Sequence, residues 1–281
     1  MNAFPIPVKF AGSGSQPGDE APDYLSVAGE MAVFRMPLPP EAADPRAMTT
    51  VRALLVRLVD AMRTQPFGVP CLDLAGLDAA TAGLLDQTLG EGEVSAIVRA
   101  PRQMRIQETA FAGIWRVREL DEDGGVVAEH IEAGAIPAVV PAAMRAMAGP
   151  LAVAPRDAAG LMNAPALLAE IVDQSARERA GEPAHVINLT LLPVSPQDLA
   201  WLADALGAGP VTLLSRGYGN CRISGTRLAN VWWVRYFNSM DKLILDTIEV
   251  VGVPAAALAA REDYADSIER LAEWIATLAD G

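Results

Sequence analysis

The sequence predicts an α+β protein made of two tandem α-β-α-β-β-β repeats with mainly antiparallel sheets, an N-terminal arm and a long C-terminal helix. Residues 71–137 align without a gap to residues 188–254, a shift of 117 residues (188 minus 71). Helical and strand-like periodicities follow in the same order in both stretches. Apolar residues make up 51% of the 281 residues, so a sizeable core is possible. The matched positions include Leu89 with Leu206, Gly90 with Gly207, Gly92 with Gly209, Val94 with Val211, Arg105 with Arg222, Thr109 with Thr226, Trp115 with Trp232, Arg118 with Arg235 and Glu132 with Glu249.

Four segments follow from this alignment. Residues 1–45 are rich in Gly, Pro and Ser around one apolar stretch, which predicts an extended arm that is either disordered or laid along a surface. Residues 46–148 form the first, degenerate repeat and residues 149–163 the joint. Residues 164–281 form the second repeat and end in the C-terminal helix.

In the first repeat, an amphipathic pattern predicts a helix over 48–63, and a short strand follows at 71–74. Asp78 is a favourable N-cap for a helix that runs to Leu89 and ends at Gly90. Three strands are then predicted, at about 93–100, 104–119 with a break, and 126–133.

The second repeat shows the same order. We expect a helix over 164–179, a strand over 185–192, and a helix from Ser195 and Pro196 to Leu206. Strands follow at about 210–216, 221–237 with a break near Gly225, and 242–251. A terminal helix over 254–280 has its apolar residues on one face.

The composition excludes several classes of partner. The net charge is −13, so duplex DNA and anionic membrane surfaces would repel the chain. A basic peptide would be attracted, although an acidic surface also simply favours solubility. The most apolar stretch, residues 133–155, is interrupted by prolines and Arg145, and no signal peptide is recognisable. We therefore expect a cytoplasmic protein that binds no nucleic acid and does not insert into membranes.

Motifs for metal, cofactor or nucleophile chemistry do not occur. The chain has no CxxC, HxxxH, HExxH or GxSxG spacing, so we expect no enzyme, cofactor or metal. Cys71 and Cys221 do not match each other in the alignment, which predicts a reducing compartment rather than a disulfide. Cys221 is either a small core residue, or a nucleophile or soft ligand in the positive field of Arg216 and Arg222.

Trp233 is one of the differences between the repeats. Along the strand at 230–238, the face of Trp232 matches that of Trp115 and is taken as core. The opposite face carries Trp233 where the first repeat has Arg116, which we expect to be partly exposed. Trp233 is therefore either an exposed binding residue beside Arg235, or a residue covered by the terminal helix.

Two polar segments are also specific to the second repeat. The turn Gly217-Tyr218-Gly219-Asn220-Cys221-Arg222 is either an ordinary hairpin turn or a specialised one that approaches a ligand closely. Asn230, Asn238, Ser239 and Asp241 either close a hairpin or form the rim of a peptide site. The candidate partner-binding residues are Tyr218, Asn220, Cys221, Arg222, Asn230, Trp233, Arg235, Tyr236, Asn238 and Asp241.

Three runs of the second repeat resemble a known family. Gly217–Arg222, the run from Asn230 through Trp232-Trp233 to Asp241, and the run from Ile244 to Glu249 are similar to the hydrogenase expression/formation protein family HupH, also called HyaF or HoxQ. The resemblance covers the whole chain, including Gly14–Pro17, and is loosest in the first repeat.

The resemblance implies an accessory chaperone in the maturation of nickel–iron hydrogenase. Such a protein would hold the immature iron–sulfur small subunit, with its basic twin-arginine leader, before export. The resemblance supplies no catalytic residues. Two alternatives are a redox or iron–sulfur-cluster-handling factor that uses Cys221, and a bridge that binds other hydrogenase accessory proteins.

Overall fold

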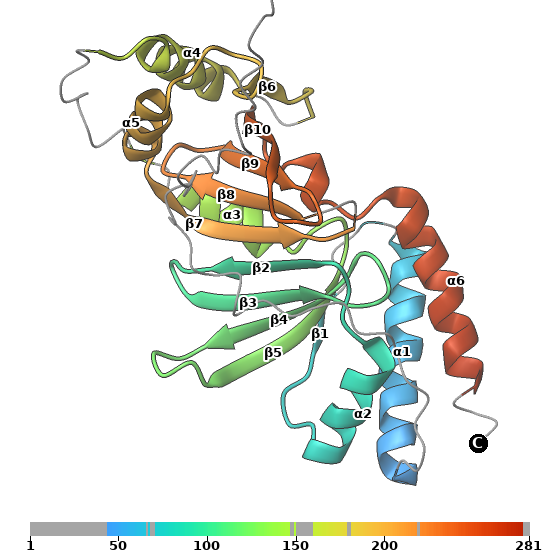
Figure 1. The fold of residues 1–281 in the computed structure, drawn as a ribbon. Helices are drawn as coiled ribbons and strands as arrows, with labels where there is room; N and C mark the ends of the chain where they lie inside the picture. The colour runs from blue at the N-terminus through green and yellow to red at the C-terminus, as the bar shows by residue number, and fades with distance from the viewer. Residues whose placement is uncertain are drawn as a thin grey trace, which may run out of the picture.

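The computed structural model describes residues 44–65, 67, 71–146, 149, 160–178, 181–217 and 220–277 (Figure 1). The predicted arm, except for its last two residues, and most of the predicted joint lie outside the described residues. The first half contains α1 (Pro45–Thr64), β1 (Cys71–Asp73), α2 (Ala79–Leu89), β2 (Val94–Val98), β3 (Gln103–Glu108), β4 (Ile114–Leu120), β5 (Val126–Ala133) and α3 (Val139–Ala146). The second half contains α4 (Ala164–Arg177), β6 (His185–Asn188), α5 (Pro196–Leu206), β7 (Ala208–Ser215), β8 (Asn220–Thr226), β9 (Val231–Phe237), β10 (Leu243–Val250), the 3-10 helix η1 (Ala255–Ala257) and α6 (Arg261–Thr277).

Local sequence signals place the ends of several helices. The Asp78 side chain accepts the Thr81 N–H at the start of α2, and Ser195 forms a capping box with Asp198 at the start of α5. Both helices end at glycines with positive φ, Gly90 at 60° and Gly207 at 61°, a conformation that glycine adopts without steric cost.

The ten strands within the described residues form one antiparallel sheet with the order β1-β5-β4-β3-β2-β7-β8-β9-β10-β6. This confirms the α+β class with antiparallel strands. The sheet is continuous across both halves, because β2 pairs with β7 from Val94–Ser215 to Val98–Val211. Read outward from this β2–β7 contact, each half has the same strand order.

Residues 117 positions apart make the same contacts in the two halves. The Trp115 Nε1–H donates to the Gly134 carbonyl at 2.9 Å, and the Trp232 Nε1–H donates to the Val251 carbonyl at 3.0 Å. A Cβ on Gly92 or on Gly209 would collide with the backbone of Thr109 or Thr226, respectively. These contacts agree with the alignment, while the division of the chain into an arm, two repeats and a joint stays a prediction.

Several sequence-based boundaries were wrong. The strand expected over 104–119 is two strands, β3 and β4, and that over 221–237 is likewise β8 and β9. The chain reverses between each pair, at Gly113 with φ 78° and at Asn230 with φ 57°. Each half therefore carries four strands after its second helix, not three. The terminal helix α6 begins at Arg261 rather than at 254, after the separate turn η1.

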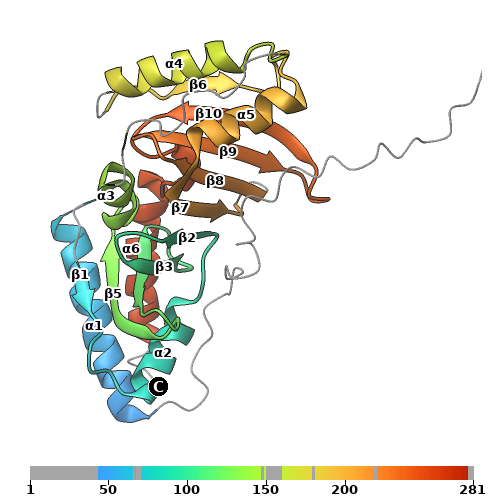
Figure 2. The same ribbon diagram turned by 90° about the vertical axis from the view of Figure 1, so that its left-hand side faces the viewer.

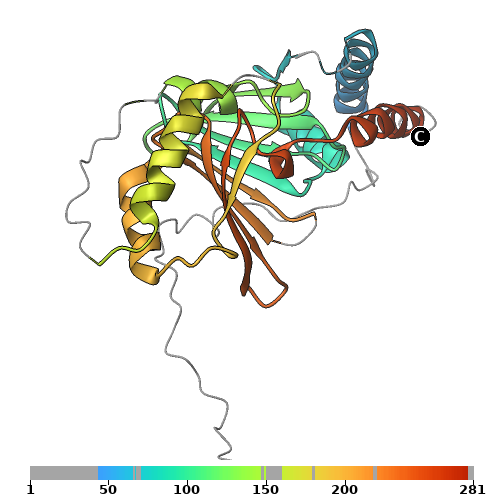
Figure 3. The same ribbon diagram turned by 90° about the horizontal axis from the view of Figure 1, so that it is seen from above.

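Helices cover the two ends of one sheet face. At one end α1, α2 and α6 enclose Ile114 and Ile131, and at the other end α4 and α5 enclose Val231 and Ile248 (Figures 1 and 2). On the opposite face, α3 and η1 pack over the middle strands, around Trp115 and Trp232. Seen from above, α6 lies beside α1 at the end of the molecule away from α4 and α5 (Figure 3).

Candidate functional site

Most of the predicted partner-binding residues meet at one end of the β8–β9–β10 meander. Across the β8–β9 pair, Asn220 faces Phe237, Cys221 faces Tyr236, and Arg222 faces Arg235. The β9–β10 turn, with Asn238 and Asp241, continues the same end of the sheet. Tyr218 lies outside the described residues.

The polar run after β9 closes a hairpin. The Asn238 Oδ1 accepts the N–H groups of Met240 and Lys242 at 2.9 and 3.0 Å, and Asp241 has a φ of 54°. The Asn220 Nδ2 donates to the Asp241 Oδ1 at 3.1 Å and so ties the start of β8 to this turn. These contacts therefore show that the residues close a hairpin turn. The turn is hydrogen-bonded within itself and to the start of β8.

Asn230 and Trp233 do not join this end of the sheet. Asn230 lies at the opposite end of β9, where its Nδ2 donates to Glu178 Oε2 at 2.6 Å. Trp233 is only 7% exposed and packs among the side chains of α4 and α5. Its Nε1–H donates to the Asp246 Oδ1 at 2.5 Å. The interpretation of Trp233 as an exposed binding residue is wrong, and α4 and α5, not the terminal helix, cover it.

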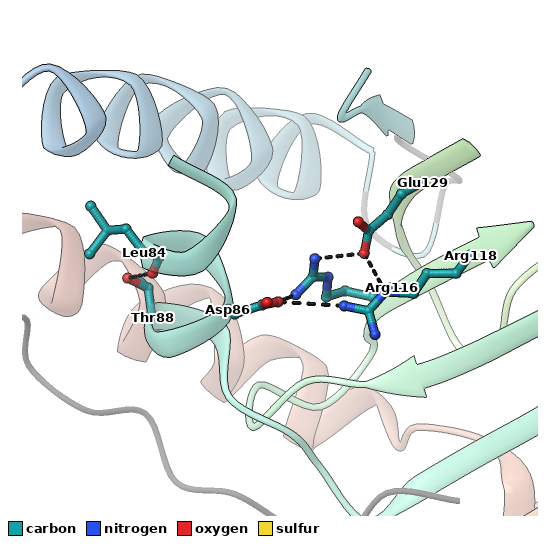
Figure 4. A network of polar contacts seen from close by, with 6 residues as sticks. All are labelled: Leu84, Asp86, Thr88, Arg116, Arg118 and Glu129. Atoms are coloured by element: carbon teal, nitrogen blue, oxygen red, sulfur yellow. Dashed lines mark hydrogen bonds and ion pairs between the residues drawn. The ribbon is translucent and has the colours of Figure 1, made fainter. Parts of the chain in front are cut away.

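The expectation that Arg116 is partly exposed was also wrong. Arg116 is 6% exposed under α2 and is paired with Asp86 and Glu129, and Arg118 also contacts both carboxylates (Figure 4). The aligned positions of Arg116 and Asp86 in the second half hold Trp233 and Ala203. The first half thus buries a guanidinium that is paired with carboxylates where the second half buries an apolar side chain, so this difference between the halves concerns the core.

Arg222 and Arg235 give the predicted surface a positive component. The Arg222 guanidinium stacks 4.6 Å above the Phe237 ring, and that of Arg235 lies 5.1 Å from the Trp233 ring and 4.0 Å from Asp246. Burial lowers the pKa of Arg235 from its usual value. Arg222 is exposed, whereas Arg235 is half-buried and serves mainly to cover Trp233.

Cys221 has the properties of a core residue. It is 4% exposed and belongs to the cluster around Trp232. Burial, together with the charge of Glu249, raises the pKa of its thiol to about 12, although a hydrogen bond with Tyr236 opposes this shift. A thiol in this state is neither a nucleophile nor a ready ligand at neutral pH. In the described residues, no three His, Cys, Asp or Glu side chains come together as a metal site would require.

Sequence reasoning missed a group of exposed apolar side chains on the β9–β10 hairpin and on the loop after β6, here called the hairpin patch. Its central members are Met240, Ile244 and Leu191, which are 81%, 57% and 80% exposed. The loop that carries Leu191 lies alongside β10, because the Asp246 N–H donates to the Thr190 Oγ1 at 2.7 Å. The full patch consists of Leu191, Leu192, Met240, Leu243 and Ile244.

A sequence signal for the hairpin patch existed. Leu243 and Ile244 are consecutive apolar residues, so one of them had to leave the alternating pattern of a half-buried strand. The aligned residues of the first half, Val126 and Val127, are also exposed, at 56% and 59%. The exposed apolar pair recurs in both halves, whereas Met240 and the loop of Leu191 and Leu192 enlarge it only in the second.

No helix in the described part of the chain combines the length and the apolar character that crossing a bilayer requires.

Comparisons with known proteins identify relatives over nearly the whole length. A family model described as "HupH hydrogenase expression protein, C-terminal conserved region" matches residues 48–152 and 161–278. The chain is 45% identical to the hydrogenase expression/formation protein HoxQ of Cupriavidus necator over 99% of this chain and 100% of that protein.

Two further relatives and one solved structure extend the comparison. The chain is 44% identical to the hydrogenase expression/formation protein HupH of Rhodobacter capsulatus, over 97% of this chain and 98% of that one. It is 32% identical to the hydrogenase-1 operon protein HyaF of Escherichia coli, over 95% and 96%. A solved structure of the hydrogenase expression protein HupH from Thiobacillus denitrificans matches at 31% identity and a TM-score of 0.39, over 41% of this chain and 96% of that chain.

Proposed function

The chain belongs to the HupH family of hydrogenase expression proteins, and from this membership we propose that it is a non-enzymatic accessory chaperone for nickel–iron hydrogenase. In this proposal it acts in the cytoplasm and holds the immature iron–sulfur small subunit before export. The family names support a role in hydrogenase formation, and the identity of the bound subunit is the step that we add.

The observation that carries the proposal is the hairpin patch. Met240 and Leu191 leave four-fifths of their surface in water, beside a turn that Asn220 and Asn238 hold rigid. Contiguous exposed apolar side chains on a soluble protein mark interaction sites. A preformed patch can hold an incompletely folded subunit by covering its apolar surface, and this task needs no catalytic group.

Electrostatics favour a basic partner segment over the molecule as a whole. The net charge of −13 attracts the basic twin-arginine leader of the precursor and accelerates its encounter with the protein. Near the hairpin patch the charges are mixed, since β8 carries the exposed Arg222 and the β9–β10 turn carries the exposed Asp241 and Lys242. The leader is therefore attracted by the overall charge, while the apolar contacts hold the complex together. Higher salt is expected to slow association more than it speeds dissociation.

A pull-down of the precursor small subunit tests the proposal with a matched control. The variant Leu243→Ser/Ile244→Ser removes part of the hairpin patch, and Val126→Ser/Val127→Ser removes the aligned exposed pair of the first half. We expect the first variant to recover at least tenfold less precursor than the wild type, and the control to recover the wild-type amount. Equal recovery by both variants would reject the hairpin patch as the contact.

Two further measurements separate the alternative functions. If the protein bridges other hydrogenase accessory proteins, it will capture one of them stably when no hydrogenase subunit is present. A role for Cys221 in redox or cluster handling would require Cys221→Ser to abolish maturation while precursor binding persists. The burial of Cys221 argues against this second role.

A further inference from the structure

The edge strand of the second half is displaced along its neighbour when it is compared with the edge strand of the first half. β6 lies beside β10 at one edge of the sheet (Figure 2), and β1 lies beside β5 at the other. In the first half Leu72 pairs with Ile131. The residue aligned with Ile131 is Ile248, and its partner is Ile187. The residue aligned with Leu72 is Leu189, so β6 is shifted by two residues along β10. A shift of two keeps each side chain on its own face of the sheet.

The shift changes the environment of one leucine. In the first half the Leu74 N–H donates to the Glu129 carbonyl at 3.1 Å, and the Leu74 side chain is buried in the cluster that contains α1 and α2. In the second half Leu189 makes the equivalent bond, to the Asp246 carbonyl at 2.9 Å, and is likewise buried. Leu191, which is aligned with Leu74, is 80% exposed. The exposure of Leu191 thus follows from the register of β6.

Thr190 ends the pairing of β6 with β10. In a regular antiparallel ladder the Asp246 N–H would return a bond to the Leu189 carbonyl. It donates instead to the Thr190 Oγ1 at 2.7 Å. The aligned residue of the first half is Asp73, whose Oδ1 accepts the Ala75 N–H at 2.9 Å. The Thr190 side chain thus reaches across to the neighbouring strand, whereas that of Asp73 bonds within its own turn.

The loop of residues 189–193, here called the Leu191 loop, is fixed at two further points. The Leu191 N–H donates to the Asn188 Oδ1 at 3.2 Å, and the Asn163 Nδ2 donates to the Pro193 carbonyl at 2.6 Å. The loop is therefore tied to β6 and to the start of α4 as well as to β10. An apolar side chain presented on a fixed backbone loses less entropy when a partner covers it.

The place and the composition of the Leu191 loop define the partner segment that it fits. The bond from Asp246 to Thr190 lies two residues from Ile244 of the hairpin patch, which is about 7 Å along a strand. One partner segment can therefore cover both the loop and the hairpin. Residues 189–194 read Leu-Thr-Leu-Leu-Pro-Val, so the loop itself offers no charge to pair with a basic side chain. These features fit an uncharged apolar segment.

We propose that Leu191 is a contact residue of the partner site and that Thr190 is its positioning residue. This inference rests on the proposed function, and it specifies the occupant as an uncharged apolar segment in the body of the immature small subunit, not its basic leader. The leucine that completes the core in the first half, Leu74, has its counterpart in the second half turned outward as a contact. Thr190 keeps it there by holding the loop against β10.

Amide hydrogen exchange of the full-length protein tests the role of Thr190 without a partner. Thr190→Val removes the acceptor of the Asp246 N–H, and Thr190→Ser keeps it. We expect exchange at Asp246 to become at least tenfold faster in the first variant and to stay at the wild-type rate in the second. Unchanged urea midpoints are expected for both, because Thr190 is exposed. Wild-type exchange at Asp246 in Thr190→Val would overturn the positioning role.

Recovery of the precursor small subunit tests the contact itself. We expect Leu191→Ser and Thr190→Val to recover at least fivefold less precursor than the wild type, at unchanged urea midpoints. Thr190→Ser and Val186→Ser, which alters an exposed apolar residue of β6, should recover the wild-type amount. The loss caused by Leu191→Ser should be the same for a precursor that lacks its leader, because the contacted segment lies in the body of the subunit.

The outcomes separate this inference from the proposed function. If the wild type captures no precursor, the proposed function fails and this inference fails with it. If the wild type captures the precursor and Leu191→Ser captures it equally well, this inference alone fails. It also fails if removal of the leader abolishes capture, since the contacted segment is then the leader. A dimer in light scattering that Leu191→Ser converts to a monomer overturns it too, since the occupant is then a second copy of the chain.

Discussion

The buried carboxyl of Glu108 allows a quantitative test of how the protein packs around it. The residue is 6% exposed at the end of β3, and its Oε1 accepts the Gly113 N–H at 3.1 Å. Burial raises the pKa of this carboxyl to about 7, and the nearby charges of Glu93 and Asp263 add to the shift. The hydrogen bonds from backbone N–H groups lower it only in part.

The sign of the resulting pH dependence follows from linkage. The folded-state pKa of about 7 lies above the ordinary value of 4.5, so the native state binds the extra proton between these values. The stability that comes from this protonated form is fully present below the unfolded pKa and is lost as the pH rises through the folded pKa. At 1.36 kcal/mol per pKa unit, the loss approaches about 3 kcal/mol in all, of which about 2.5 kcal/mol falls between pH 5 and pH 8.5.

Glu108→Gln removes the ionisation while keeping an oxygen that can accept the Gly113 N–H. As the pH rises from 5 to 8.5, we expect the free energy of unfolding of the wild type to fall by about 2.5 kcal/mol relative to that of the variant. Urea unfolding followed by tryptophan fluorescence at several pH values measures this gap. The exposed Glu122→Gln is the matched control and should run parallel to the wild type. If Glu108→Gln also runs parallel, the carboxyl is hydrated and the assigned burial is incorrect.

Three further predictions concern the core and the cysteines. Gly209→Ala should destabilise more than Gly225→Ala, by about 1–3 kcal/mol, since the first Cβ collides with the Thr226 backbone, whereas the second collides with the flexible Met144 side chain and approaches the Val211 carbonyl less closely. Urea midpoints rank the two variants, and the reverse order would contradict this view. Arg116→Trp should lower the unfolding free energy by about 2 kcal/mol, because it leaves Asp86 without its partner. Adding Asp86→Ala should restore part of the lost free energy, and a double-mutant cycle detects this as coupling between the two positions. Additive effects would argue against the view that the two halves differ by an ion pair in one and an apolar residue in the other. One thiol, that of the exposed Cys71, should react quickly with a disulfide reagent in the native protein, and the second only after unfolding; two rapid equivalents would mean that Cys221 is accessible.

The parts of the fold that are set by residues close together in the sequence could be predicted. The ends of α2 and α5 follow from Asp78, Ser195 and the glycines after them, because a cap is made by residues within one turn. The two chain reversals between β3 and β4 and between β8 and β9 could not be located, since Gly113 and Asn230 show their positive φ only when the strands on both sides are paired.

The proximity of several candidate residues could be predicted, while whether they form a binding site stays a prediction. The runs 220–222 and 235–241 were expected to act together, and strand pairing places them at one end of the sheet. Alternation also predicted that Trp232 and Trp233 point to opposite faces. It could not tell that helices cover both of those faces, so the interpretation of Trp233 as an exposed contact failed.

The sequence by itself determined most of the helices and strands and their order, the correspondence between residues 117 positions apart, and the family, because these depend on residue identity and short-range geometry. Only the tertiary structure decided which surfaces are buried. The β2–β7 pairing joins the halves into one sheet, and α6 crosses to pack on α1 of the first half. Such contacts join residues far apart in the chain, and several partners of similar apolar character compete for each face. The choice among them is made by how all the elements pack at once.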